Sequence, residues 1–258
     1  MKILIILLRE KEIIYINNRK VNFFMSLNLL ILAIYPSIAF ILWVYLKDRY
    51  DKEPIKILGR FFVLGAFISV IGIICEDFLI NINKYSGNYY IIYSSFIVAG
   101  FTEEGLKAIV LISNVIKEKS FNEKLDGIIY SVFLSLGFAT VENIIYLYFE
   151  DVSNVFRISL IRGIISVPAH MMFAITMGYY ISKYKFSNSK SKRREYIILS
   201  ILVPILLHGI FDLLLLVKFK LSKVIFIIYL ILLWKINLDK LDEYTNISRK
   251  RFFRINKK

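Results

Sequence analysis

The 258-residue chain is too apolar for an ordinary soluble domain, since 57% of its residues are hydrophobic and its mean hydropathy is +0.62. Its formal net charge of +14 would suggest a nucleic-acid partner in a soluble protein. In a membrane protein, however, Lys and Arg collect on the cytoplasmic side, so we expect no nucleic-acid binding. The single cysteine, Cys75, excludes an intrachain disulfide and a CxxC metal or redox motif.

Seven apolar segments of roughly 20 residues follow one another along the chain, each long enough to cross a hydrocarbon core about 30 Å thick. The connections between them are short and carry most of the charge. This pattern predicts an all-α, polytopic transmembrane helical bundle of about seven spans, forming one domain over residues 25–238. The expected spans are 23–46, 57–80, 91–116, 125–149, 159–183, 196–217 and 222–238.

Positive charges alternate between the connections and predict the orientation of the chain in the cell membrane. The connections 47–56 and 183–195 hold four and six Lys or Arg residues, whereas 84–90 and 150–158 hold one each. The N-terminus is therefore expected outside and the C-terminus in the cytoplasm. The basic tail, residues 239–258, is expected to contact anionic lipids of the inner leaflet.

The first 22 residues conflict with that orientation, because they carry five Lys or Arg residues on the side predicted to be outside. Their opening apolar run is too short for a cleavable signal peptide. Met25 lies just inside the first expected span. We therefore treat residues 1–24 as an N-terminal extension and hypothesise that translation begins at Met25, which mass spectrometry of the N-terminal peptide would test.

Polar and ionisable side chains inside the third to sixth expected spans are the main functional signal. Each ionisable group costs about 2.5–3.5 kcal/mol at the centre of a membrane, so five unpaired groups would cost roughly 12–18 kcal/mol. That rivals the whole stability of a typical domain, about 5–15 kcal/mol. The groups must therefore face one another or water, and so form a site. They are Glu103, Glu104, Lys107, Glu142, Asn143, Arg162, His170, His208 and Asp212.

The helical rise of 1.5 Å per residue places Glu103, His170 and His208 near the membrane midplane or in its outer half. Pro168 and Pro204 precede the two histidines by two and four residues. A proline in a span bends the helix and frees a carbonyl group, which favours a cavity that holds water. Each histidine taken alone would more often be a hydrogen-bonded residue of the bundle interior.

The adjacent residues Glu103 and Glu104 point about 100° apart around their helix. One is therefore expected to work in the cavity while the other pairs with Lys107 or Arg162. Lys107 lies four and three residues after the two glutamates, the spacing of an intrahelical ion pair, and is expected to be a counter-ion.

Four further polar residues allow structural readings. Glu142 and Asn143 would serve equally well as a helix-packing clamp or as supporting residues of the site. Arg162 lies near the outer end of its expected span, as an interfacial anchor would. Glu76 is expected to be solvated at the outer end of the second span.

Six motifs follow one another along the expected spans and their connections: DRYDKEP at 48–54, EEGLK at 103–107, LDGIIY at 125–130, GFATVENIIY at 137–146, HMMFAITMG at 170–178 and HGIFD at 208–212. Together they resemble the PrsW family of membrane proteases over about residues 45–216. That family is related to the CAAX prenyl-endopeptidases and to bacteriocin-processing membrane proteins.

The resemblance implies an intramembrane endopeptidase of the bacterial cell membrane that acts in a stress response. Its expected partner is a single-span membrane protein, an anti-sigma factor, which it would cut at the first site on the extracytoplasmic side. The placement of the ionisable groups in the outer half of the membrane agrees with that activity.

Two mechanisms fit the polar residues, and the first needs no cofactor. Glu103 would activate a water molecule, His170 would help to hold it, and His208 would stabilise the oxyanion. This scheme resembles the glutamate-dependent one of the CAAX relatives, in which the position of Asp212 is often Asn. An ionised Asp212 would repel an oxyanion, so it would have to be protonated or act by orienting His208. Glu104 belongs to the same expected catalytic set.

In the second mechanism His170, His208 and Glu103 bind zinc, with Asp212 as an additional ligand or a partner of the ligands. No HExxH motif is present, so the metal-free scheme is favoured. The alternative function is a proton- or ion-coupled transporter, because buried carboxylates and histidines also form proton relays. Transporters usually show internal repeats, and the sequence has none. A silent relative on the same scaffold should lack one of the polar groups, and here all are present.

Overall fold

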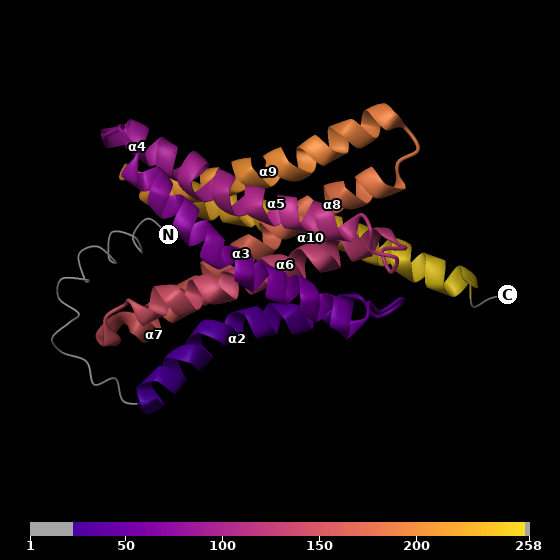
Figure 1. The fold of residues 1–258 in the computed structure, drawn as a ribbon, viewed down its shortest axis with the longest axis horizontal. Coiled ribbons are helices and arrows are strands. Elements are labelled where there is room, and N and C mark those ends of the chain that lie inside the picture. The colour runs from indigo at the N-terminus through magenta and orange to yellow at the C-terminus, as the bar shows by residue number, and fades with distance from the viewer. Residues whose placement is uncertain (1–22, 256–258) are drawn as a thin grey trace.

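A computed structural model describes the backbone of residues 23–255, and the side chains of all of these except 23–26 and 152 (Figure 1). The predicted N-terminal extension lies outside the described residues apart from 23 and 24, and the start at Met25 stays a prediction. The elements are α2 (Phe23–Lys47), α3 (Ile55–Asn81), α4 (Gly87–Tyr93), η1 (Ser94–Phe101), α5 (Thr102–Val115), α6 (Lys124–Tyr148), α7 (Val152–Ile161), η2 (Arg162–Ser166), α8 (Val167–Phe186), α9 (Lys190–Leu216) and α10 (Ser222–Ile255).

The described residues form helices and no strands, which confirms the predicted all-α bundle. Within the described part of the chain, five helical segments are long and apolar enough to cross a membrane, fewer than the seven expected: 27–47, 55–81, 124–148, 153–186 and 190–216. The expected span 91–116 corresponds to the succession of α4, η1 and α5, in which three charged side chains interrupt the apolar run. The expected span 222–238 is the first half of α10, which continues as one helix into the basic tail.

Helix α6 forms the centre of the bundle, where it packs against α2, α3 and α8 (Figure 1). Two glycines let α3 and α6 approach closely. A Cβ atom at Gly65 would lie 1.8 Å from the carbonyl oxygen of Leu134, and one at Gly137 would lie 2.0 Å from that of Phe62. Close contact through small residues is a common way for membrane helices to pack.

A proline in α2 shows how backbone groups are satisfied inside the bundle. Pro36 has no N–H, so the carbonyl of Leu32 loses its partner within the helix. The hydroxyl of Ser159 on α7 donates to that carbonyl oxygen at 2.9 Å. This bond ties α2 to α7, as is required where water cannot satisfy a free carbonyl.

Two π-helical segments lie directly before the predicted site residues. Segment η1 leads into Glu103 and Glu104, and η2 leads into His170. Wide turns of this kind are frequent at functional sites. Pro168 follows η2 and cannot donate to the carbonyl of Ile164 four residues earlier, which accounts for the wider turn there.

Large apolar side chains on the outer faces of the helices are exposed, including Phe67 and Ile74 on α3 and Leu206 on α9. Such side chains suit contact with lipid rather than water. Together with the apolar helices, they fit a multi-pass membrane protein whose polar groups are turned inward.

Candidate active site

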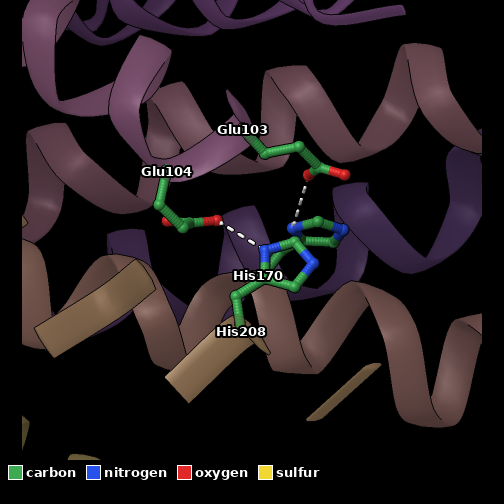
Figure 2. Close-up of side chains that lie close together, drawn as sticks. All are labelled: Glu103, Glu104, His170 and His208. Atoms are coloured by element: carbon green, nitrogen blue, oxygen red, sulfur yellow. Dashed lines mark hydrogen bonds and ion pairs between the residues drawn. The ribbon is translucent and has the colours of Figure 1, made fainter. Parts of the chain in front are cut away.

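The two histidines and the two adjacent glutamates meet inside the bundle. Glu103 and Glu104 come from α5, His170 from α8 and His208 from α9 (Figure 2). All four side chains are buried, and each offers a ligand atom within 4.8 Å of those of the others. We call these four residues the central cluster. Three helices therefore contribute to one compact group of acids and imidazoles.

The ammonium group of Lys107 sits among three members of the central cluster. Its Nζ lies 3.3 Å from Glu103 Oε2, 2.7 Å from Glu104 Oε1 and 3.1 Å from His170 Nδ1. The same atom lies 4.1 Å from the ring centroid of Phe138, a cation–π distance. Because a lysine has three N–H donors, these contacts use all of them. Lys107 thus has the position of an internal counter-ion.

The two adjacent glutamates have different surroundings. Glu104 makes the closer ion pair with Lys107 and also accepts from His208 Nδ1 at 3.1 Å. Glu103 lies 3.9 Å from His170 Nδ1 and lines a cavity, whereas Glu104 is absent from the lining. Glu103 is therefore the carboxylate placed to reach a water molecule or a substrate.

The cavity beside the central cluster has a volume of about 260 Å³. A single water molecule needs roughly 15 Å³ of such space, so the cavity has room for several waters or for a peptide group. Its lining combines polar groups with an apolar wall of side chains such as Phe173. The acidic and histidine side chains of the lining are Glu76, Glu103, Glu142, His170, His208 and Asp212.

The partners of His170 determine its tautomer. An ammonium group only donates, so Nδ1 of His170 accepts from Lys107 and the ring proton lies on Nε2. Nε2 then donates to Glu142 Oε2 at 2.9 Å. Glu142 is itself held by Arg162, whose Nη2 lies 2.8 Å from Oε1. Glu142 therefore orients His170 and belongs to the site.

Its neighbour Asn143 acts as a packing residue. The Asn143 amide donates to the carbonyl oxygen of Ala33 on α2 at 3.2 Å, and its oxygen accepts from Arg162 Nε. Of the two roles expected for Glu142 and Asn143, Glu142 has that of a supporting residue of the site and Asn143 has that of a packing residue. The interpretation of Arg162 as an interfacial anchor is wrong, because the residue is 7% exposed and its guanidinium contacts Glu142 and the ring of Tyr146.

His208 presents one ring nitrogen to the cavity. Its ring stacks on that of Phe173, with centroids 5.0 Å apart, and its Nδ1 is directed at Glu104. Nε2 lies 3.7 Å from Asp212 Oδ2, which is longer than a hydrogen bond. Asp212 therefore does not hydrogen-bond His208 in this structure, and Nε2 has no hydrogen-bond partner among the described residues.

Glu76 on α3 is a cavity residue that the sequence reasoning missed. The expectation of a solvated side chain is wrong, because Glu76 is fully buried and lines the cavity. Neither of its carboxylate oxygens has a hydrogen-bond partner in the described part of the chain. Its position could have indicated burial, because Glu76 lies five residues before the end of α3 at Asn81 and is therefore inside the helix.

The central cluster also has the donors of a transition-metal site. Two imidazoles and a carboxylate form a known catalytic zinc set, and His170, His208, Glu103 and Glu104 supply it. Glu104 Oε2 is buried without a hydrogen-bond partner among the described residues, so one acceptor is free. The residues therefore fit a zinc ion.

The fold and the site together define a class of protein: a multi-pass helical membrane protein with buried acids and imidazoles around an interior cavity. Residues 53–236 match the family described as "PrsW family intramembrane metalloprotease". The chain belongs to the PrsW family of intramembrane proteases, and it is a peptidase. This result favours the protease over the transporter considered from the sequence.

Individual relatives agree with the family match. The chain is 54% identical over 229 residues to Protease PrsW of Clostridioides difficile (strain 630), covering 89% of this chain and 96% of that protein. It is 38% identical to Protease PrsW of Bacillus subtilis (strain 168), covering 70% of this chain and 79% of that one. No solved structure matches the chain.

Proposed function

We propose that this peptidase hydrolyses a membrane-anchored protein with a water molecule that Glu103 activates. The observation that carries the proposal is the joint lining of one buried cavity by Glu103, His170 and His208. A carboxylate and two imidazoles around a space large enough for water are the groups that general acid–base hydrolysis needs.

The proposed roles follow from the contacts of each side chain. Glu103 takes a proton from water as the water oxygen attacks the carbonyl carbon of the substrate. His170, held by Glu142, helps to position that water. His208, as an imidazolium whose Nδ1–H stays on Glu104, donates from Nε2 to the oxyanion, with Asp212 Oδ2 3.7 Å from Nε2. Glu103 then returns the proton to the leaving amide nitrogen, so that protons balance.

The zinc-dependent scheme stands beside this one because the donor set fits. His170, His208 and Glu103 would hold the ion. A bound zinc ion supplies Lewis acidity, polarising a carbonyl group and lowering the pKa of water. Glu142 would keep its role behind His170, since a carboxylate often fixes the tautomer of a metal-binding histidine.

The proposed substrate is a single-span anti-sigma factor, which the enzyme cuts at the first site on the extracytoplasmic side. The attacking water is the one that Glu103 activates. The support is the membership of the PrsW family and the likeness of the motifs. We further propose that the N-terminus lies outside, and that the basic tail, of which residues 239–255 form the end of α10, lies in the cytoplasm against anionic lipids.

Cleavage in cells tests the proposal. The full chain is co-expressed with single-span anti-sigma factors, and wild type is compared with Glu103→Gln, Glu104→Gln, His170→Ala and His208→Ala. We expect the four variants to lose cleavage while Glu195→Gln, an exposed glutamate at the start of α9, keeps it. Cleavage by all four variants at the wild-type rate would contradict the proposed site.

Metal dependence needs a separate measurement on purified protein. The wild-type enzyme is treated with a chelator, and cleavage is followed before and after zinc is returned. The glutamate scheme predicts unchanged cleavage at every step. Loss of cleavage that zinc restores would assign the chemistry to a metal held by the central cluster.

A further inference from the structure

Two of the six motifs contribute no residue to the central cluster or to the lining of its cavity, yet the fold brings them together. DRYDKEP (48–54) connects α2 to α3, and LDGIIY (125–130) opens α6. Both lie at the end of the bundle where α6 begins. Asp48 and Glu53 from the first motif, Asp126 from the second, and the preceding Glu123 are all buried there. We call these four residues the end cluster.

Three carboxylates of the end cluster converge on one point. Asp48, Glu123 and Asp126 each offer an oxygen within 4.8 Å of those of the other two. Backbone N–H groups donate to one side-chain oxygen of each aspartate. Asp48 Oδ2 accepts from the N–H of Glu53 at 2.8 Å, and Asp126 Oδ2 accepts from the N–H groups of Asn122 and Glu123, each at 2.8 Å.

One side-chain oxygen on each of the three carboxylates has no hydrogen-bond partner in the described part of the chain. Asp48 Oδ1, Glu123 Oε1 and Asp126 Oδ1 are buried and lack a hydrogen bond within the described residues. Asp48 and Asp126 are fully buried, and Glu123 is 5% exposed. Capping of α6 explains one oxygen of Asp126 but not its other one. Buried acceptors of this kind are costly unless something binds them.

The surrounding charges do not balance the end cluster. Glu53 adds a fourth buried carboxylate, which accepts a hydrogen bond from the hydroxyl of Tyr130. Arg251 contributes a cation at the edge, where its Nη1 lies 3.6 Å from Glu123 Oε2 and its side chain is 41% exposed. Among the described residues, this contact with Arg251 is the one ion pair of the end cluster, so its four carboxylates outnumber the cations that pair with them.

We propose that Asp48, Glu123 and Asp126 bind a hard divalent cation, Mg²⁺ or Ca²⁺. All of the donors are oxygens, which suits these ions, whereas imidazole and thiolate ligands would suit zinc. The bound ion joins the α2–α3 connection to the first turn of α6. It therefore ties the central helix α6 to the connection between α2 and α3, at a site separate from the central cluster.

Terbium luminescence on the purified full-length protein tests the site directly. Tb³⁺ replaces Ca²⁺ in oxygen sites and emits when a nearby tyrosine is excited, and Tyr130 contacts Glu53 of the end cluster. We expect saturable emission from the chelator-treated protein that Ca²⁺ or Mg²⁺ displaces. The relative displacement by the two ions identifies which of them the site prefers.

Matched variants place the ion. Asp126→Asn and Asp48→Asn should each weaken Tb³⁺ binding by at least about tenfold, whereas Asp51→Asn, an exposed aspartate of the same connection, should not. If Asp126→Asn fails to fold, Asp48→Asn decides, because Asp48 lies between helices. Binding to both variants as tight as to wild type would overturn the proposal, and so would the absence of emission from wild type.

The central cluster must be excluded as the source of the signal. In the double variant Glu103→Gln/His208→Ala we expect unchanged Tb³⁺ emission and an unchanged effect of Mg²⁺ or Ca²⁺ on the unfolding temperature. Loss of both effects in this variant would place the ion at the central cluster and overturn the proposal. The result is independent of peptidase activity, since no step of the measurement uses a substrate.

Discussion

The central cluster and the end cluster both bury several carboxylates, but their charges are compensated differently. In the centre, Lys107 contacts Glu103 and Glu104, and Arg162 contacts Glu142. At the end, the one ion pair of the cluster among the described residues joins Glu123 to Arg251 at 3.6 Å, and the Arg251 side chain is 41% exposed.

The difference follows from the cations that are available around each cluster. Inside a membrane no ion is freely available, so the cations that balance buried acids must belong to the chain itself. At the end of the bundle, water and dissolved cations are close, so a dissolved cation can balance part of the negative charge of the end cluster. The predictions below test whether the internal cations of the centre act as this comparison requires.

The largest effect is expected for the carboxylate that faces the cavity. Glu103→Gln removes the proposed base but keeps the shape of the side chain, so cleavage should fall by about 10²–10⁴-fold while the protein stays folded. The measurement is the cleavage rate of a co-reconstituted substrate in vesicles. Wild-type cleavage by this variant would show that another group activates the water.

Lys107→Met should remove the compensation of two buried glutamates at once. Breaking a buried ion pair from one side costs about 3–5 kcal/mol, so the free energy of unfolding in detergent micelles should fall by that amount. The double variant Lys107→Met/Glu104→Gln should recover part of the loss, because one uncompensated charge is removed with its partner. An unchanged stability of Lys107→Met would mean that the glutamates are already neutral. If the central cluster binds zinc, zinc should stabilise Lys107→Met more than wild type, because the Lys107 ammonium no longer occupies Glu103 and His170.

The convergence of the central cluster could be predicted because of the cost of charge in a membrane. Ionisable residues on successive spans had to meet, and the spacing of Glu103, Glu104 and Lys107 indicated an ion pair within one helix. The depth of single residues was less certain, since it depends on where a helix begins. Helix α7 begins at Val152, so Arg162 lies about 15 Å along a continuous helix instead of at its end.

Contacts between distant motifs could not be predicted from the sequence. Asp48 and Asp126 meet where the α2–α3 connection lies beside the first turn of α6, and no spacing rule links positions in separate elements. The π-helical turns η1 and η2 were also not foreseen. Pro168 was expected to bend its helix, but a proline in the sequence does not specify that the bend takes the form of a wider turn before it.

Arg162→Gln should have a smaller effect than Lys107→Met. Glutamine keeps an N–H donor for Glu142 or Asn143 but removes the charge, so we expect a loss of about 1–3 kcal/mol in the free energy of unfolding. Cleavage should fall as well, because Glu142 then holds His170 less firmly. The pH profile of cleavage separates the two causes: a fold defect alone lowers the rate at every pH, whereas an altered His170 shifts the profile. A variant with wild-type stability and pH profile would contradict the role of Arg162.

The smallest effect is expected for Glu76→Gln, and it tests the comparison most sharply. Glu76 lines the same cavity as Glu103, but no side chain in the described part donates a hydrogen bond to it. The substitution replaces one buried polar group that has no partner with another of the same shape, so the free energy of unfolding should change by less than about 1 kcal/mol. Cleavage should stay near the wild-type rate, in contrast to Glu103→Gln. A loss of cleavage as large as that of Glu103→Gln would show that proximity to the cavity, and not pairing with Lys107 and His170, selects the working carboxylate.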